Sequence, residues 1–381
     1  MVREASELTR QWASTWDHLG TNFPYYFNSE EPRRFYFSIG EALANQDSQK
    51  LKIDPVGILQ MLSRSYMFGD RTLIDGLRMC PWMARPTEGN GWCYADVPRH
   101  GNAKVNPRSI AITLLDALES EMVGYIGDIG SVGILLSGGL DSRIVAGVLR
   151  KLQLEKVFNG DVLAMTWGIE GTRDVEYAKA IASRFGWEWQ HYAITAENLR
   201  QNIIEAGKAG AEFAPLHLHA MPMVKKARGI DMIVAATYGD GIGKAKYSGR
   251  DLTKLAPTIP RSPNRYGLVQ CDVVSSIGDK IANDVYAYRS RVPRSHEYEY
   301  RECEQQIHYL RRKLNPCMMY MNQELKVVQA FTSPQVFSLM WSIDPVYRNS
   351  EIYYQLLRLL PGDLGSIPES ASGLRVGAKH G

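Results

Sequence analysis

The sequence lacks both a cysteine framework and long apolar runs. Its five cysteines are an odd number at wide spacings and include no CxxC pair: Cys80, Cys93, Cys271, Cys303 and Cys317. This pattern argues against paired disulfides, a zinc knuckle and a dithiol redox site. No apolar stretch approaches the ~20 residues of a membrane span, and the first residues contain no apolar leader. We therefore expect a cytoplasmic protein rather than a membrane protein.

An excess of either charge is also missing. The 381 residues include 44 Lys and Arg and 41 Asp and Glu, for a net charge of +3. Such a chain has no global field that would draw it onto nucleic acid, so the composition argues against a nucleic-acid partner. With 45% hydrophobic residues it is an ordinary globular sequence, and its length favours two domains.

The middle of the chain alternates apolar runs typical of strands with helical spacing. Strands are expected at 132–136, 162–167, 188–194 and 231–237, and helices at 106–127, 174–185, 198–208 and 222–228. Alternating units of this kind predict an α/β fold with a mostly parallel, doubly wound sheet. Before this region we expect a small, irregular α+β region. After it we expect a long excursion at 246–293, a helical part at 301–360 and a mobile end at 361–381.

A glycine-rich loop follows the first of these strands, after Leu136. Its residues are Ser137, Gly138, Gly139, Leu140, Asp141 and Ser142. Adjacent glycines let the backbone approach an anion and adopt positive φ, and the next helix offers unpaired N–H groups. The carboxylate of Asp141 would repel phosphates unless a divalent cation lay between them, so we expect Mg²⁺ there. The loop is neither a Walker A nor a GxGxxG motif, and the competing interpretation is an ordinary glycine-rich turn at a helix start.

The segment GILLSGGLDS, residues 133–142, resembles the ATP-pyrophosphatase loop (PP-loop) of glutamine-dependent asparagine synthetases. The resemblance is to their synthetase domain and to the related β-lactam synthetases and lasso-peptide cyclases. Residues 166–168 with the following Asp174 and Glu176 are similar to the family's adenine-pocket region, and Gly239-Asp240-Gly241 resembles its second signature.

The resemblance implies an ATP-dependent ligase that forms AMP and pyrophosphate. A small-molecule or peptide carboxylate would be adenylated and then joined to ammonia or an amine in an amide bond. ATP phosphates would bind the loop after Leu136. Adenine would lie near Met165, Thr166, Trp167 and Gly168, and the second signature (Gly239, Asp240 and Gly241) would complete the ATP site. Glu212 and Asp240 are the expected substrate contacts.

The sequence departs from the family at its beginning. Members that hydrolyse glutamine carry a cysteine directly after the initiator Met, whereas Val2 stands here. We expect residues 1–102 to be a truncated or divergent N-terminal region without a glutaminase nucleophile, and residues 103–381 to be the asparagine synthetase-like domain. A separate protein that supplies ammonia is then a candidate partner.

A second departure concerns the acidic pair that follows the second signature in the family. Gly243 and Lys244 stand in its place. Lys244 could meet the phosphates directly, or it could be a solvated loop lysine in a shifted register. The family also uses a lysine near the end of the domain, for which Lys379 is the candidate. Asp141, Lys244 and Lys379 are thus the expected catalytic residues.

Two other functions compete with this prediction. One is a PP-loop enzyme that modifies a base of tRNA, for which short basic runs such as Lys225-Lys226 could supply contacts. The other is a non-catalytic nucleotide-binding subunit, which the lost acidic pair would suit.

Overall fold

The computed structural model describes residue 19 and residues 24–31, 33–87, 91–127, 129–246, 258–260 and 262–378. The chain forms two compact units, each built from three stretches of sequence. Unit 1 comprises Met1–Val97, Arg200–Leu218 and Tyr247–Tyr320, and unit 2 comprises Pro98–Leu199, His219–Lys246 and Met321–Gly381. The chain first passes from unit 1 to unit 2 after Val97, close to the domain boundary predicted after residue 102. The later stretches of unit 1, however, come from within the predicted domain 103–381.

Unit 2 contains a five-stranded sheet in which every pairing is parallel. Its strands are β5 (Ser131–Leu135), β6 (Asp161–Gly168), β7 (Glu188–Ala193), β8 (Met232–Ala235) and β9 (Lys326–Gln329). The strand order is β7-β6-β5-β8-β9, so successive strands are added in one direction from β5 and then in the other. This reversal is the doubly wound arrangement. The predicted α/β fold class is confirmed.

The central strand β5 is buried because its side chains meet neighbours on both sides. Val132, Ile134 and Leu135 are at most 5% exposed. Gly133 leaves room for the side chains of the adjoining strands, since a Cβ there would lie 2.9 Å from Met165 Sδ. A strand covered on both faces reads as a continuous apolar run, which explains why the sequence pattern located it well.

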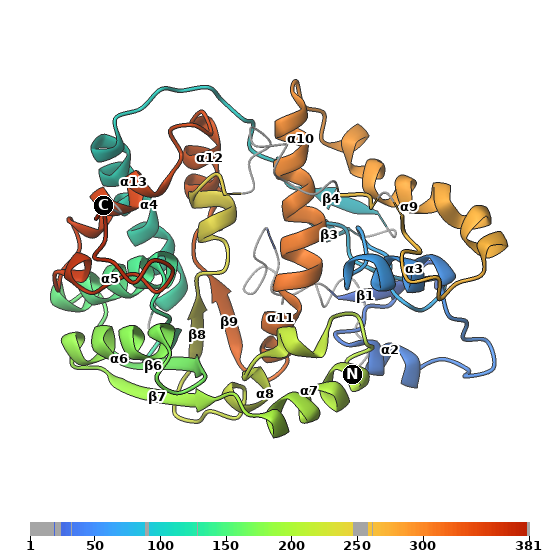
Figure 1. Ribbon diagram of the computed structural model, residues 1–381, viewed down its shortest axis with the longest axis horizontal. Coiled ribbons are helices and arrows are strands. Elements are labelled where there is room, and N and C mark those ends of the chain that lie inside the picture. Colours follow the sequence, from blue (N-terminus) through green and yellow to red (C-terminus); the bar gives the residue numbers. More distant parts are fainter. Residues whose placement is uncertain are drawn as a thin grey trace. The chain divides into compact units, whose positions relative to one another are not determined.

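Helices pack against this sheet and against one another, as Figure 1 shows for α4, α5, α12 and α13. Helix α4 begins where predicted because Asn106 caps it, accepting from the backbone N–H groups of Arg108 and Ser109. The helices of this unit are α4 (Pro107–Ile126), α5 (Leu140–Leu154), α6 (Arg173–Phe185), α8 (Met221–Val224), α12 (Pro334–Ser342) and α13 (Ser350–Leu357), with the short turn η5 (Leu364–Ser366).

One expectation for the second half of the chain is incomplete and another is wrong. The chain leaves unit 2 after Lys246, as the excursion predicted at 246–293 implies, but this segment contains a 21-residue helix, α9 (Cys271–Arg291), that was not predicted. The part predicted to be helical at 301–360 contains β9, which pairs with β8. A four-residue strand has too few residues to establish a period of two, so it becomes recognisable only through its partner.

Unit 1 combines short antiparallel pairs with helices, as predicted for an α+β N-terminal region. Strand β1 (Tyr25–Phe27) pairs with β2 (Leu77–Met79), and β3 (Ala84–Pro86) pairs with β4 (Trp92–Tyr94). Its helices are α2 (Ile39–Ala44), α3 (Pro55–Arg64), η1 (Pro215–Leu218), α9, α10 (Glu297–Glu304) and the π-helix η4 (Gln305–Leu314). Helices α7 (Ala196–Lys208) and α11 (Pro316–Asn322) each contribute residues to both units.

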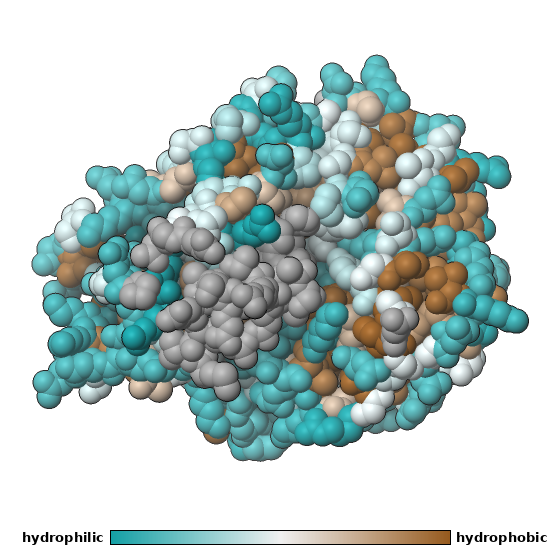
Figure 2. Space-filling view, turned by 180° about the vertical axis from the view of Figure 1, so that it is seen from behind, coloured by the Kyte–Doolittle hydropathy of each residue, from teal (hydrophilic) through white to brown (hydrophobic). Residues whose placement is uncertain are grey.

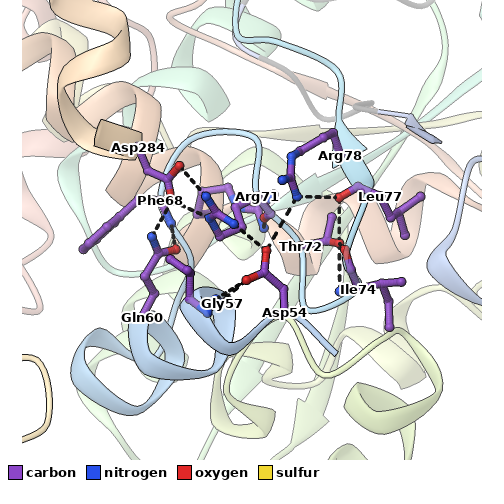
Figure 3. Close-up of polar contacts among 12 residues, drawn as sticks. Asp54, Gly57, Gln60, Phe68, Arg71, Thr72, Ile74, Leu77, Arg78 and Asp284 are labelled. Carbon is purple, nitrogen blue, oxygen red and sulfur yellow. Dashed lines mark hydrogen bonds and ion pairs between the residues drawn. The ribbon is translucent and has the colours of Figure 1, made fainter. Parts of the chain in front are cut away.

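A buried ion cluster joins distant parts of unit 1 (Figure 3). The guanidinium of Arg71 pairs with Asp54, which caps α3, and with Asp284 of α9, where its Nη2 donates to Oδ1 at 2.9 Å. Gln60 of α3 donates to the same Asp284 at 2.7 Å. Charges this deeply buried need such partners, so the cluster fixes α3 against α9.

The surface mixes hydrophilic residues with separate hydrophobic patches (Figure 2). Exposed large hydrophobic residues include Ile112 and Val123 on α4. Among the described residues, no helix has the length and apolar character needed to cross a membrane.

Candidate active site

The predicted loops meet where the strand order of unit 2 reverses. The loop after Leu136 follows β5, and Gly239–Gly243, a short π-helix (η2), follows β8. Strands β5 and β8 are parallel neighbours, with Val132 opposite Met232, so their carboxyl ends lie at the same edge of the sheet. In open α/β sheets this reversal point leaves a crevice in which ligands bind. The arrangement therefore brings the two predicted signatures together.

The two serine hydroxyls close the first loop upon itself. Ser142 Oγ lies 3.0 Å from Ser137 Oγ and accepts from the Ser137 backbone N–H at 3.1 Å. The N–H of Gly139 donates to Ser137 Oγ at 3.2 Å. These bonds shape the turn before any ligand binds, which reduces the ordering cost of ligand capture.

The expectation that the paired glycines adopt positive φ is wrong. Gly139, the residue before α5, has φ −75°, and Gly138 is not among the positive-φ glycines. Gly138 is required by close packing instead, because a Cβ would lie 2.9 Å from Ser370 Cβ and 3.1 Å from the carbonyl oxygen of Arg173. A Cβ on Gly139 would meet only Ser137 Oγ, at 3.3 Å.

Arg143 supports the loop from beneath and was not predicted. Its side chain is fully buried in α5, and its Nη2 donates to the carbonyl of Gly138 at 2.8 Å and of Pro368 at 2.7 Å. Its Nη1 donates to the carbonyls of Leu364 and Ile367 at 3.0 and 2.6 Å. Burial lowers the pKa of Arg143 to about 10. The chain after Pro361, predicted to be mobile, is thus tied to the loop at residues 364–368. The only sequence signal for this role of Arg143 was an arginine within an otherwise apolar helix face.

Lys244 lies between the two acids of the site. Its Nζ is 3.1 Å from Asp141 Oδ1 and 2.6 Å from Asp240 Oδ1. Lys246, also absent from the predicted set, pairs with Asp240 Oδ2 at 2.5 Å. The Lys244 side chain is 14% exposed, so the interpretation of it as a solvated loop lysine is wrong. Its catalytic role, like that of Asp141, stays a prediction.

Burial and ion pairing have opposite effects on the pKa values of Asp141, Asp240 and Lys244. Burial raises the pKa of Asp141 above its usual value, and the ammonium of Lys244 only partly offsets this effect. For Asp240, Lys244 and Lys246 outweigh burial and lower the pKa. Burial opposes the charge of Lys244, but the two carboxylates outweigh it and raise its pKa. The lysine therefore stays protonated.

These residues do not fit a divalent metal held between the two carboxylates. Mg²⁺ needs oxygen ligands at about 2.0–2.1 Å, and the point where Asp141 and Asp240 converge is taken by the Lys244 ammonium. This arrangement does not test whether Asp141 by itself binds Mg²⁺, so that expectation stays a prediction.

The predicted adenine segment lies on β6, next to β5. Met165 and Thr166 are buried, and Thr166 Oγ1 donates to the carbonyl of Leu136 at 2.9 Å. Trp167 and Gly168 are partly exposed, and the Trp167 ring lies 6.0 Å from that of His219. The sheet thus places all four beside the loop, with the last two the more accessible.

The remaining predicted residues lie elsewhere. Glu212 belongs to unit 1, where it is buried, accepts from Tyr25 at 3.2 Å and pairs with Arg312 at 3.3 Å. Its role as a substrate contact stays a prediction. Lys379 lies outside the described residues.

Comparisons with known proteins identify part of the chain. No curated protein matches it. The U34-tRNA thiolase NcsA from Methanococcus maripaludis is similar at 13% identity over 52% of this chain and 78% of that chain, with a TM-score of 0.27. A predicted subunit of tRNA methyltransferase from Methanocaldococcus jannaschii is similar at 15% identity over 40% of this chain and 64% of that chain, with a TM-score of 0.20.

The family described as asparagine synthase matches residues 113–241, from within α4 to the Gly239-Asp240-Gly241 signature. The matched segment includes β5 to β8 and the first loop of the site, and it ends within η2, before Lys244. Residues 113–241 are therefore part of an asparagine synthetase-like domain.

Proposed function

We propose that the protein is an ATP-dependent ligase that adenylates a carboxylate and joins it to ammonia or an amine. The observation that carries the proposal is the meeting of the Asp141 loop with Lys244 at the reversal point of an asparagine synthase-type sheet. Families of this type use ATP, and the loop and the lysine provide the groups that a triphosphate requires.

The N-terminus of α5 suits phosphate binding. The first backbone N–H groups of a helix have no partner within the helix, and the helix dipole adds a partial positive charge there. The helix is 15 residues long and begins directly after Gly139, without a side-chain cap. The N–H groups at this end of α5 would attract an anion, and the ammonium groups of Lys244 and Lys246 balance the charges of Asp141 and Asp240 beside it.

In the proposed reaction a substrate carboxylate oxygen attacks the α-phosphorus of ATP, and the bond from that phosphorus to the bridging oxygen of pyrophosphate breaks. Nitrogen then attacks the acyl carbon, AMP leaves, and an amide forms. Negative charge grows on the departing pyrophosphate, so fixed donors and a protonated lysine placed there stabilise the transition state more than the ground state. Asp141 and Asp240 orient that lysine.

The proposed nitrogen donor is ammonia or an amine rather than glutamine. A separate ammonia-supplying protein is the partner that this assignment suggests. Incubation of the purified protein with nitrogen-labelled glutamine and, separately, labelled ammonium tests it. Transfer of label from glutamine by the protein alone would refute it.

The reaction is tested by exchange of labelled pyrophosphate into ATP across a panel of carboxylates. The variants are Asp141→Asn and the matched control Asp161→Asn, which makes the same change at the exposed start of β6. We expect exchange that depends on one carboxylate, falls at least about 100-fold in Asp141→Asn and persists in Asp161→Asn.

Other outcomes would favour the competing functions. ATP binding without exchange for any carboxylate would indicate a nucleotide-binding subunit. AMP release that requires added tRNA and no free carboxylate would indicate a base-modifying PP-loop enzyme. Equal exchange in Asp141→Asn and the native protein would show that the loop is not the site.

A further inference from the structure

The contacts of Lys244 show how the charges at the reversal point balance. Two carboxylates from different loops, Asp141 and Asp240, converge on its Nζ at 3.1 and 2.6 Å. The second oxygen of Asp240 is paired with Lys246, whose side chain is 57% exposed, compared with 14% for Lys244. Two carboxylates and two ammonium groups make the cluster neutral.

A divalent ion could enter between these carboxylates only at a high cost. It would have to displace the Lys244 ammonium, which would then be buried without its partners, or it would add two positive charges to a neutral cluster. Removing one partner of a buried ion pair is strongly destabilising. Two carboxylates alone compensate Mg²⁺ poorly for the bound waters that it would lose, because it gives them up reluctantly.

The lysine is held firmly in this position. Its backbone N–H donates to the carbonyl of Gly239 at 2.9 Å, and the Tyr353 hydroxyl donates to the same carbonyl at 2.9 Å. The Tyr353 ring lies 5.0 Å from Lys244 Nζ, in range of a cation–π contact. Gly243 permits this approach, since a Cβ there would lie 1.9 Å from the Tyr353 hydroxyl oxygen.

We propose that Lys244 is a built-in cation that occupies the position between Asp141 and Asp240 where a divalent metal ion would otherwise bind, so that the free protein holds no divalent ion there. The geometry alone carries this part of the proposal. The use of that cation toward ATP phosphates rests on the proposed function.

A consequence is that removing the lysine creates a metal site. With Lys244→Met the side chain keeps a similar length and loses its charge, leaving two converging carboxylates of the kind that Mn²⁺ prefers. Among the described residues, no group of three or more His, Cys, Asp or Glu side chains is placed to hold a metal, so background binding should be weak.

The experiment is a titration of the full chain with Mn²⁺ alone, without nucleotide, followed by electron paramagnetic resonance. The set comprises the native protein, Asp240→Asn, Lys244→Met, Lys244→Met with Asp240→Asn, and Lys246→Met. The last variant removes a positive charge from the same carboxylate, but at the exposed position. Circular dichroism checks that each variant is folded, and Lys244→Gln replaces Lys244→Met if the latter is not.

We expect Lys244→Met to bind one Mn²⁺ at least about tenfold more tightly than the native protein, and the added Asp240→Asn to remove that gain. Lys246→Met should stay within about threefold of the native affinity, since the inner ammonium remains. Two results would overturn the proposal. One is tight Mn²⁺ binding by the native protein that Asp240→Asn abolishes, and the other is a folded Lys244 variant with no gain.

This readout is independent of catalysis. A native protein that fails to exchange pyrophosphate would refute the proposed function and leave the metal result standing. If the native protein exchanges pyrophosphate but Lys244→Met gains no metal site, the inference about Lys244 is refuted and the proposed function stands.

Discussion

The guanidinium of Arg143 donates a hydrogen bond of 2.8 Å to the carbonyl oxygen of Gly138, five residues earlier in the same loop-helix segment. The remaining donors on its two terminal nitrogens reach carbonyls at residues 364–368. One buried side chain thus joins the candidate phosphate loop to a segment more than 200 residues away in the chain. A planar fork with several fixed donors is needed for this, and a lysine cannot reproduce it.

Arg143→Lys should therefore destabilise the protein and loosen the loop. We expect the free energy of unfolding to fall by about 3 kcal/mol, because a single ammonium cannot reach all four carbonyls that Arg143 contacts. Urea unfolding measures this loss, and the affinity for ATP should fall with it. Arg150→Lys, on the same helix, should change the stability by less than about 0.5 kcal/mol. Equal effects of the two substitutions would contradict the assigned role.

The two glycines of the loop should separate folding from binding. Gly138→Ala should cost about 1–3 kcal/mol in stability, since the added Cβ meets Ser370 and the carbonyl of Arg173 within 3.1 Å. Gly139→Ala should fold normally, because φ −75° suits alanine and only a serine hydroxyl lies near. If phosphates approach the backbone here, its methyl group should weaken ATP binding. Thermal unfolding and ATP titration of both variants check this pair, and unchanged ATP binding in Gly139→Ala would place the phosphates elsewhere.

Tyr353→Phe should weaken the second loop while leaving the ring in place. The substitution deletes the donor to the Gly239 carbonyl, so we expect a loss of about 1 kcal/mol in unfolding free energy and weaker ATP binding. Tyr354→Phe makes the same change at the next, less buried position and serves as the control. The prediction fails if the two variants have equal stability and equal ATP affinity.

His308 should make unit 1 sensitive to acid. Its Nδ1 accepts from the Gly69 N–H at 2.9 Å, and burial, assisted by Arg311, lowers its pKa to about 3. The unfolded chain, with a histidine pKa of about 6.5, binds this proton first. Stability is therefore complete above pH 6.5 and falls as the pH drops toward 3, by up to about 1.4 kcal/mol per pH unit.

The test compares urea unfolding of the native protein and His308→Gln between pH 7.5 and pH 4.5. The variant should be less stable at pH 7.5, and the difference should shrink as the pH falls. Parallel profiles for the native protein and His308→Gln would show that this histidine does not titrate between the two states.

Much of unit 2 could be predicted because its signals are local. The apolar run of β5, the Asn106 cap of α4 and the glycine at the end of α6 each depend on residues within a few positions. The strand boundaries for β5, β6 and β7 differ from the prediction by only a residue or so. Strand β9 and helix α9 were missed since β9 is only four residues long and α9 lies in a segment punctuated by prolines and glycines.

The candidate site was predictable only in part. The sequence by itself determined that a glycine-rich loop with Asp141 would follow a buried strand, because strand period and turn residues act over short distances. Only the tertiary structure decided that Lys244 enters the space between Asp141 and Asp240 and that Arg143 holds the loop from beneath. The Lys244–Asp141 pair and the bonds from Arg143 to residues 364–368 join positions a hundred or more apart along the chain, which the sheet order of β5 and β8 and the packing of α5 bring together.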